Sequence, residues 1–274
     1  MSTLCTVFSL VTERDFELEG MGVDATYLNA PVEEELFVKP PPEFSPFSRD
    51  KPFVRRLRKS LYGLKQSGRN WNNTLDDFLV GIGLARSTTD SCLYFSRDDG
   101  GETNLLVVVY VDDLVIAGRR EKVDEFKHNI SQHFRMKDLG SLSRMLGIEV
   151  RHDRPNGPMT ISQGSYIREV LKIYGFDEGR GVPTPVEGKV KTRHPSRPTS
   201  PPNRSHLELT YKRLFRYLST VPDFGIMFGG KSNGHGLEGF VDADWAEDVE
   251  DRKSTTGYVF KLNGGAIRWC SRKR

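Results

Sequence analysis

Two adjacent carboxylates, Asp112 and Asp113, lie between two apolar runs in the stretch from Leu105 to Gly118. The runs are rich in β-branched residues, which predicts two buried strands joined by a tight, acidic hairpin. Neighbouring side chains of a regular strand point to opposite faces, whereas at a turn both carboxylates can converge. Two converging carboxylates beside a hydrophobic sheet need a cation to offset their repulsion and desolvation. Magnesium, or manganese in its place, is the expected ion because it takes oxygen ligands and substrate phosphates.

The acidic hairpin has a second interpretation, because Asp is favoured in ordinary turns and needs no function there. The tetrapeptide Tyr110-Val111-Asp112-Asp113 favours the metal site. It resembles the Tyr-x-Asp-Asp hairpin of reverse transcriptases, whose aspartates hold metal for nucleotidyl transfer. A match this short is weak alone, so its interpretation depends on the remainder of the chain.

Composition predicts a globular protein with room for a sizeable core. The chain has 274 residues, of which 36% are hydrophobic and 28% charged, and a net charge of +3 argues only weakly for an anionic partner. Three widely spaced cysteines suggest neither a disulfide framework nor a zinc cluster, which favours a reducing, intracellular compartment. No apolar run approaches the ~20 residues of a membrane span, and the start of the chain lacks the cationic segment of a signal peptide. We therefore expect neither secretion nor a membrane partner.

A basic stretch runs from Arg49 to Arg69 and contains a single acid, Asp50. It is either an amphipathic surface with a solvated basic face or a track that binds nucleic-acid phosphates and releases counterions. The candidate contacts to a nucleic-acid backbone are Arg55, Arg56, Arg58, Lys59 and Arg69.

Amphipathic helices that would support the acidic hairpin are predicted on both sides of it. Apolar residues at helical spacing predict one helix over 71–82, ended by Gly83, and another over 120–134. We interpret the stripe of the first helix, which includes Trp71, as core packing without a functional role. The expected arrangement is an antiparallel sheet backed by these helices, with the two aspartates at its exposed edge.

The second half of the chain contains further elements. Asn156-Gly157 predicts a β-hairpin, and apolar periodicity predicts helices at 167–174 and 207–218. Six prolines between Pro183 and Pro202, mixed with basic residues, predict an extended linker. The segment 237–269 contains only three short strands, which cannot cover both faces of a sheet.

Ordered sequence blocks along nearly the whole chain resemble the polymerase region of copia-type retrotransposon polyproteins, followed by the start of their ribonuclease H domain. The blocks lie at 25–42, 59–66, 110–113, 136–140, 146–149, 216–218 and 242–258. The resemblance implies an α+β fold, with a reverse-transcriptase palm made of an antiparallel sheet backed by helices, a partial thumb, and an incomplete ribonuclease H-like α/β fragment. The expected boundaries are 1–187 for the palm and partial thumb, 188–206 for a proline-rich basic linker, and 207–274 for a connection helix and the truncated nuclease segment.

The mechanism that the resemblance implies is two-metal nucleotidyl transfer, with an RNA template, a DNA primer and deoxynucleoside triphosphates as partners. Three carboxylates normally hold two ions about 4 Å apart, one ion activating the primer 3′-hydroxyl and the other clamping the triphosphate. Asp112 and Asp113 take the catalytic and metal-binding roles of the hairpin. Residues expected to contact nucleotide or template are Tyr27, Tyr110, Gly63 and Lys65.

The third metal-binding carboxylate is the main departure from the family pattern. Gly22 stands where the aspartate of an earlier strand is expected. Asp24 would lie about 6–7 Å further along a regular strand, which makes it a weak substitute. In the nuclease segment only Asp242 has its expected place, and the other acids of that site would lie beyond Arg274. We therefore expect no ribonuclease H activity, and the family's fingers segment is expected to be largely missing.

Two functions follow from these observations. The first is an RNA-directed DNA polymerase domain, impaired because of Gly22 and acting with other parts of a retrotransposon polyprotein. The alternative is a catalytically dead, nucleic-acid-binding relic with no independent activity. A palm-like nucleotide cyclase of other ancestry is disfavoured by the matching blocks far from the hairpin. The expected location is intracellular, in the cytoplasm, the nucleus or retrotransposon particles.

Overall fold

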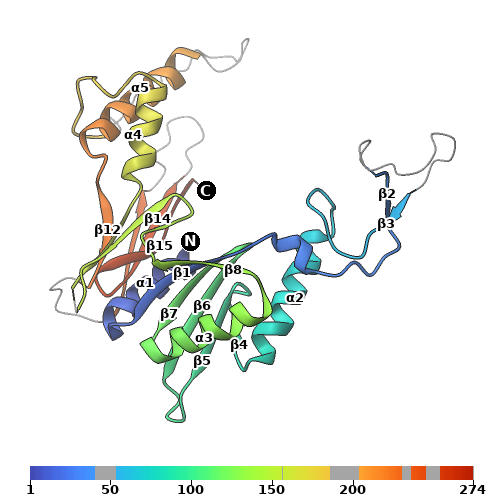
Figure 1. Ribbon diagram of the computed structural model, residues 1–274. Coiled ribbons are helices and arrows are strands. Elements are labelled where there is room, and N and C mark those ends of the chain that lie inside the picture. Colours follow the sequence, from blue (N-terminus) through green and yellow to red (C-terminus); the bar gives the residue numbers. More distant parts are fainter. Residues whose placement is uncertain (41–53, 156, 186–203, 230–235, 245–253, 274) are drawn as a thin grey trace. The chain divides into compact units, whose positions relative to one another are not determined.

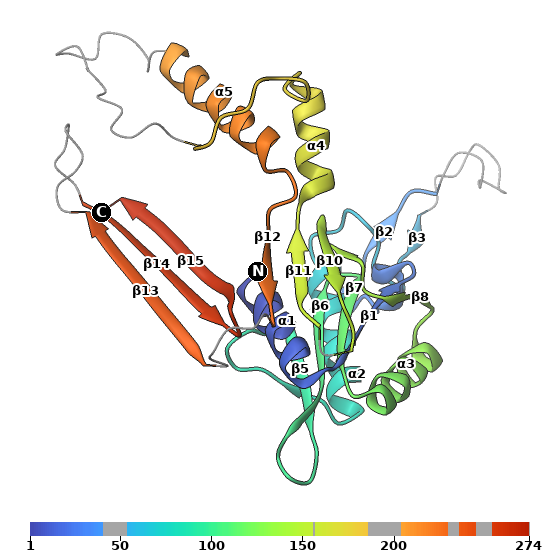
Figure 2. The same cartoon turned by 90° about the vertical axis from the view of Figure 1, so that its left-hand side faces the viewer.

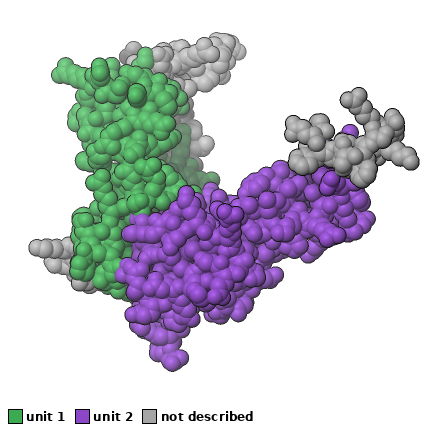
Figure 3. Space-filling view, in the orientation of Figure 1, with its two compact units in different colours: residues 1–15, 143–274 green, residues 16–142 purple. Residues whose placement is uncertain are grey.

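The structure is a computed structural model that describes residues 1–40, 54–155, 157–185, 204–229, 236–244 and 254–273. The chain divides into two compact units, one of Phe16–Leu142 and one of Met1–Asp15 together with Ser143–Arg274 (Figure 3). The described residues contain five α-helices and four antiparallel sheets. The predicted α+β class is therefore confirmed.

The unit Phe16–Leu142 is built on a six-stranded sheet in the order β4-β5-β6-β7-β1-β8 (Figure 1). Its strands are β1 (Glu17–Val23), β4 (Ala85–Arg86), β5 (Leu93–Arg97), β6 (Thr103–Tyr110), β7 (Asp113–Gly118) and β8 (Met136–Ser141). All neighbouring strands pair antiparallel. The strands β6 and β7 lie in the middle of the sheet, and nearly all of their residues are buried. This explains why their sequences read as continuous apolar runs and do not alternate with polar residues.

Two helices cover one face of this sheet, as the apolar periodicity predicts. They are α2 (Ser67–Gly81) and α3 (Arg120–His133), which lie side by side in Figure 1. Gly83, with a φ of 94°, follows α2 in the left-handed conformation that favours glycine. The core between helices and sheet contains Trp71, Leu75, Leu79, Val107, Val109, Leu114, Ile116, Val123, Phe126 and Ile130.

Smaller elements of this unit connect β1 to α2. The short 3₁₀ helix η1 (Thr26–Asn29) follows β1, and β2 (Phe37–Val38) pairs antiparallel with β3 (Arg55–Arg56). Residues 41–53, between β2 and β3, lie outside the described part of the chain.

The other unit combines two sheets with three helices (Figure 2). Its helices are α1 (Ser2–Arg14), α4 (Gly164–Ile173) and α5 (Arg204–Thr220). One sheet has the order β12-β11-β10-β9, with β9 (Arg144–Met145), β10 (Ile148–His152), β11 (Met159–Ser162) and β12 (Gly225–Phe228). The other has the order β13-β14-β15, with β13 (Leu237–Asp244), β14 (Thr255–Leu262) and β15 (Gly265–Lys273).

Several predictions for this second unit are confirmed. The hairpin expected at Asn156-Gly157 is present as the antiparallel pair β10 and β11. The helices expected at 167–174 and 207–218 correspond to α4 and α5, and the three strands expected at the C-terminal end are β13 to β15. The predicted linker, 188–206, lies almost wholly outside the described residues, and α5 begins at Arg204.

The N-terminal helix α1 joins this second unit through a buried asparagine. Asn263 lies in the turn between β14 and β15 with a φ of 50°, a conformation that asparagine tolerates. Its Nδ2 donates to Thr12 Oγ1 at 2.9 Å, and its backbone carbonyl accepts from Gly229 N at 3.0 Å. These bonds tie the end of β12 to the turn between β14 and β15, and tie α1 to the same turn, which lies 251 residues further along the chain than Thr12.

Within the described residues, none of the helices is both long and apolar enough to cross a lipid bilayer.

Candidate active site

The acidic hairpin has the geometry that the sequence predicts. The last cross-strand pair of β6 and β7 is Tyr110 with Asp113, so the loop between them consists of Val111 and Asp112 alone. Val111 and Asp112 are exposed, and Asp113 is half-buried. Val111 has a φ of 56°, which is rare for a β-branched residue. The two acids thus lie at the tip of the hairpin, beside the core and open to solvent.

Both backbone carbonyls of the two-residue loop accept hydrogen bonds from other elements. The indole Nε1 of Trp71, on α2, donates to Val111 O at 2.6 Å. The backbone N of Val23, at the end of β1, donates to Asp112 O at 2.8 Å. The tip of the hairpin is therefore held from two sides by elements distant in sequence.

The electrostatics of the tip favour a cation. Burial raises the pKa of the Asp113 carboxyl, and the negative charge of Asp112 raises it further. In the part of the chain that the structure describes, no ion pair offsets the charge of either carboxylate. A hard divalent cation would relieve both the repulsion and the desolvation, and carboxylate oxygens are the donors that Mg²⁺ or Mn²⁺ accepts. The two residues fit such an ion as a partial set of ligands.

Gly22 is the direct cross-strand neighbour of Asp113 in the pairing of β1 with β7. A Cβ atom built on Gly22 would lie 3.9 Å from Asp113 Oδ1, an ordinary van der Waals distance. An aspartate at position 22 would thus place a third carboxylate beside the pair without a steric clash. With glycine there, the described residues contain no group of three or more His, Cys, Asp or Glu side chains placed to hold a metal ion.

Asp24 lies beyond the end of β1 and not further along a regular strand. Its Oδ2 pairs with Arg135 Nε at 3.0 Å, its backbone N donates to Arg135 O at 2.9 Å, and Ala25 follows with a φ of 50°. The expected spacing along a regular strand does not apply, because β1 ends at Val23. A role for Asp24 as a substitute metal ligand stays a prediction.

Of the residues expected to contact nucleotide or template, Gly63, Lys65 and Tyr110 are exposed, whereas Tyr27 is half-buried against the core. Tyr27 belongs to η1, and its ring lies 4.7 Å from that of Tyr62, centroid to centroid. Gly63 has a φ of 93°, Lys65 is exposed, and Tyr110 is 53% exposed at the hairpin. Their roles stay predictions.

The basic residues singled out from the sequence are all exposed to solvent. Arg55 and Arg56 form β3, and Arg56 Nη1 pairs with Glu35 Oε1 at 3.1 Å. Arg58 and Lys59 follow β3, and Arg69 lies in the first turn of α2. This exposure is compatible with both interpretations, the solvated basic face and the phosphate track.

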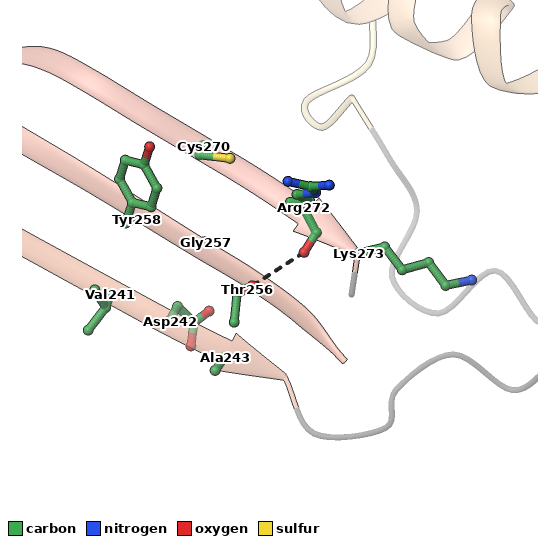
Figure 4. Close-up of a pocket in the computed structure, with 9 residues that line it drawn as sticks. All are labelled: Val241, Asp242, Ala243, Thr256, Gly257, Tyr258, Cys270, Arg272 and Lys273. Atoms are coloured by element: carbon green, nitrogen blue, oxygen red, sulfur yellow. Dashed lines mark hydrogen bonds between the residues drawn. The ribbon is translucent and has the colours of Figure 1, made fainter. Parts of the chain in front are cut away.

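Asp242 lies far along the chain, on β13, opposite Gly257 of β14. It borders a cavity of about 810 Å³ whose other lining residues include Tyr258, Cys270 and Arg272 (Figure 4). Asp242 is the only acidic residue among those that line this cavity. The described lining therefore offers one carboxylate, beside cationic side chains.

The sequence does not predict that two further residues, Trp71 and Lys137, lie near the hairpin. Trp71 belongs to an apolar stripe, which predicts only that it is buried, although a buried indole N–H usually finds an acceptor. Gly22 of β1 pairs with Asp113 of β7 on one side and with Lys137 of β8 on the other. Paired residues of neighbouring strands share a face, so all three residues lie on one face of the sheet. The strand β8 has mostly exposed residues, and apolar periodicity does not reveal it.

Comparisons with known proteins show which family the chain is similar to. The sequence profile of the family "Reverse transcriptase (RNA-dependent DNA polymerase)" matches residues 2–188. The retrovirus-related Pol polyprotein from transposon TNT 1-94 of Nicotiana tabacum is 30% identical in an alignment that covers 99% of this chain. The one from transposon RE1 of Arabidopsis thaliana is also 30% identical, over 98% of this chain. This chain spans only 23% and 20% of their lengths. The putative transposon Ty5-1 protein of Saccharomyces cerevisiae is 28% identical over 92% of either chain.

Proposed function

Since this chain belongs to the reverse transcriptase (RNA-dependent DNA polymerase) family, in the form found in Pol polyproteins of copia-type retrotransposons, we propose that it is an impaired RNA-directed DNA polymerase domain. The observation that carries the impairment is the position of Gly22 beside Asp113, where a third carboxylate would complete the acidic cluster. With glycine at position 22, only Asp112 and Asp113 of the three expected carboxylates would remain to hold the metal ions.

The proposed chemistry is nucleotidyl transfer at the tip of the β6–β7 hairpin. Asp112 and Asp113 would hold Mg²⁺ or Mn²⁺, which when bound supplies activation of the primer 3′-hydroxyl and neutralises triphosphate charge. Burial and the charge of Asp112 raise the pKa of the Asp113 carboxyl, and a nearby cation would favour its charged form. Lys137, on the same face, offers the triphosphate a cationic partner.

The proposed partners are an RNA template, a DNA primer and deoxynucleoside triphosphates. The exposed cations Arg55, Arg56, Arg58, Lys59 and Arg69 would bind backbone phosphates. Tyr27 would lie under the incoming sugar, with Tyr110, Gly63 and Lys65 at the nucleotide and template. These are proposals from the family pattern, supported by the exposure of the basic side chains and of Tyr110.

The finer organisation is also proposed. Residues 1–187 would form the palm with a partial thumb, and 188–206 the linker. Residues 207–274 would form a connection helix and a ribonuclease H-like segment, for which we expect no hydrolase activity because the described lining of the cavity offers Asp242 as its only acid. The domain would act inside the cell with other parts of a Pol polyprotein and without a membrane partner.

Primer extension on an RNA template, with Mg²⁺ or with Mn²⁺, tests the proposed polymerase activity. We expect little or no extension by the wild-type chain, and extension at least about tenfold faster by Gly22→Asp, a gain typical of restored metal ligation. Asp112→Asn in either background removes a metal ligand and should abolish the product. Efficient extension by the wild-type chain, lost in Asp112→Asn, would show that two carboxylates suffice and that the domain is not impaired.

The alternative function, a nucleic-acid-binding relic, is favoured by the same glycine. It predicts no extension by Gly22→Asp, but binding to an RNA–DNA duplex that weakens steeply with salt. Charge reversal at Arg55 and Arg58 should then reduce that binding, because phosphate contacts are its only source of affinity. Restored synthesis by Gly22→Asp would reject the relic.

A further inference from the structure

The hydrogen bonds at the hairpin tip constrain one residue, Asp112, from both sides. Trp71 Nε1 fixes Val111 O, and so the orientation of the planar peptide group between Val111 and Asp112. Val23 N fixes Asp112 O, and so the next peptide group, between Asp112 and Asp113. With the planes before and after it held, φ and ψ of Asp112 are set. The direction of its Cα–Cβ bond follows from these two angles.

The indole that makes the first of these bonds is itself held in place by aromatic neighbours. The ring of Trp71 is 2% exposed and packs edge-on against Phe134, with centroids 5.3 Å apart. Phe134 packs against Phe78 at 5.2 Å, and His133 stacks on Phe78 at 4.8 Å. Residues of α2 and of the end of α3 both contribute to this aromatic cluster. The cluster therefore holds the indole ring in the orientation in which its N–H donates to the hairpin.

The bond from Trp71 also stabilises an unfavourable backbone conformation. Val111 has a φ of 56°, and a β-branched residue in that region is sterically disfavoured. Without the indole N–H, Val111 O would lose its protein donor in a partly buried position. Both effects would allow the two-residue loop to relax into other conformations, in which the carboxylates of Asp112 and Asp113 diverge.

We propose that Trp71 is a positioning residue for the metal-binding carboxylates, acting through the backbone of Val111 and not by contact with substrate or metal. This inference rests on the proposed function, since it assumes that Asp112 and Asp113 hold a divalent cation. Metal sites tolerate displacements of only about 0.5 Å, so loss of the indole bond weakens the site even when the fold is intact.

The test measures Mn²⁺ affinity by electron paramagnetic resonance of the free ion, in the full-length chain with glycine or aspartate at position 22. The variant Trp71→Phe keeps a buried ring and removes the N–H donor. Two controls accompany it. Trp269→Phe makes the same chemical change on β15, and Leu79→Val removes buried volume from α2 without touching a hydrogen bond.

We expect Trp71→Phe to weaken Mn²⁺ binding about tenfold, the usual effect of removing an outer support of a metal ligand. Amide hydrogen exchange at residues 110–114 should also become about tenfold faster without metal. Both controls should bind Mn²⁺ as their parent does, although Leu79→Val unfolds at lower denaturant concentration. A purely structural role for Trp71 would instead make Trp71→Phe and Leu79→Val behave alike.

The outcomes separate this inference from the proposed function. If Gly22→Asp combined with Trp71→Phe binds Mn²⁺ as tightly as Gly22→Asp alone, the positioning role is overturned while the metal site stands. If Gly22→Asp binds Mn²⁺ no better than Gly22→Asp combined with Asp112→Asn, the metal site itself is rejected and the positioning role with it.

Discussion

At the residue scale, the proposed metal site at the hairpin would oppose stability. Asp113 is half-buried beside Asp112, and neither burial nor a neighbouring negative charge favours its ionised form. Nothing in the described fold requires a carboxylate at this position, since an amide would fill the same space. Under the proposed function, the cation that Asp113 would hold accounts for its charge, and without a cation this charge would lower the free energy of unfolding.

The sign of this cost can be predicted for Asp113→Asn. Because the pKa of Asp113 is raised in the folded chain, the folded state binds more protons than the unfolded state between the ordinary and the raised pKa. The free energy of unfolding of the wild-type chain therefore falls as pH rises through that window, and the full cost remains above it. We expect Asp113→Asn to raise the free energy of unfolding at pH 7 by roughly 0.5–2 kcal/mol. At a pH below both pKa values the two chains should be nearly equal.

Urea denaturation in metal-free buffer, from pH 3.5 to pH 8, measures this difference. Tyr110→Phe serves as the control, because it changes an exposed neighbour of the hairpin without changing charge. An Asp113→Asn chain less stable than wild type at pH 7 would contradict the account. It would mean that the carboxylate has a stabilising partner in the folded protein.

At the element scale, a buried carboxylate joins β1 to α3 and, through a shared lysine, to β8. Glu19 of β1 is 7% exposed and pairs with Arg120 Nη1 at 2.5 Å and with Lys127, both on α3. Lys127 also pairs with Asp138 Oδ2 of β8 at 2.7 Å. Since β8 is an edge strand with few buried side chains, this network supplements its backbone pairing with β1.

We predict that Glu19→Gln lowers the free energy of unfolding at pH 7 by about 2–4 kcal/mol, because it leaves two cations without their shared buried partner. Burial alone would raise the pKa of Glu19, but hydrogen bonds and charge from Lys127 and Arg120 outweigh it, so the pKa is lowered. A lowered pKa means that this stabilisation is complete above the ordinary pKa of a glutamate and is lost as pH falls through the lowered value. The deficit of Glu19→Gln should therefore shrink in acid.

Thermal or urea unfolding at pH 7 and pH 3 measures this prediction. Glu125→Gln is a matched control on α3, the helix that carries both partners of Glu19, because Glu125 is exposed and pairs only with Lys122 among the ion pairs described, at 2.7 Å. Its effect should stay within about 0.5 kcal/mol. Equal effects of the two substitutions would show that burial of Glu19 adds nothing to its ion pairs.

Elements with a strong local pattern were predictable from the sequence, and elements defined by distant contacts were not. The apolar runs around Asp112 and Asp113 and the stripes of α2 and α3 are periodic, so the hairpin and both helices follow from spacing. The strand β8 is polar and exposed, and only its pairing with β1 defines it. The hydrogen bond from Trp71 to Val111 joins residues 40 apart in the sequence. Helical periodicity predicts that the Trp71 ring is buried, but it does not predict which acceptor the indole N–H reaches.

At the scale of the whole molecule, the division into units does not follow the order of the chain. The residues Met1–Asp15 belong with Ser143–Arg274, and Phe16–Leu142 forms the intervening unit. Sequence patterns give no sign of this, because the contacts of α1 with β12 and β15 join the two ends of the chain. The candidate site, by contrast, lies wholly within the intervening unit, since β1, α2, β6, β7 and β8 all belong to it.

This location predicts that the excised fragment Phe16–Leu142 folds on its own and keeps the hairpin site. The hydrophobic core between its helices and its sheet is made of its own residues, from Met21 to Met136, and a unit with its own core is expected to unfold cooperatively. Uniform ¹⁵N labelling checks this, because Trp71 is the only tryptophan in the fragment and gives a single indole resonance. That resonance should match the one lost from the spectrum of full-length Trp71→Phe. The variant Ile116→Asp, which buries an unpaired charge in β7, should abolish cooperative unfolding. A fragment with random-coil shifts and no unfolding transition would mean that the rest of the chain is needed to fold the site.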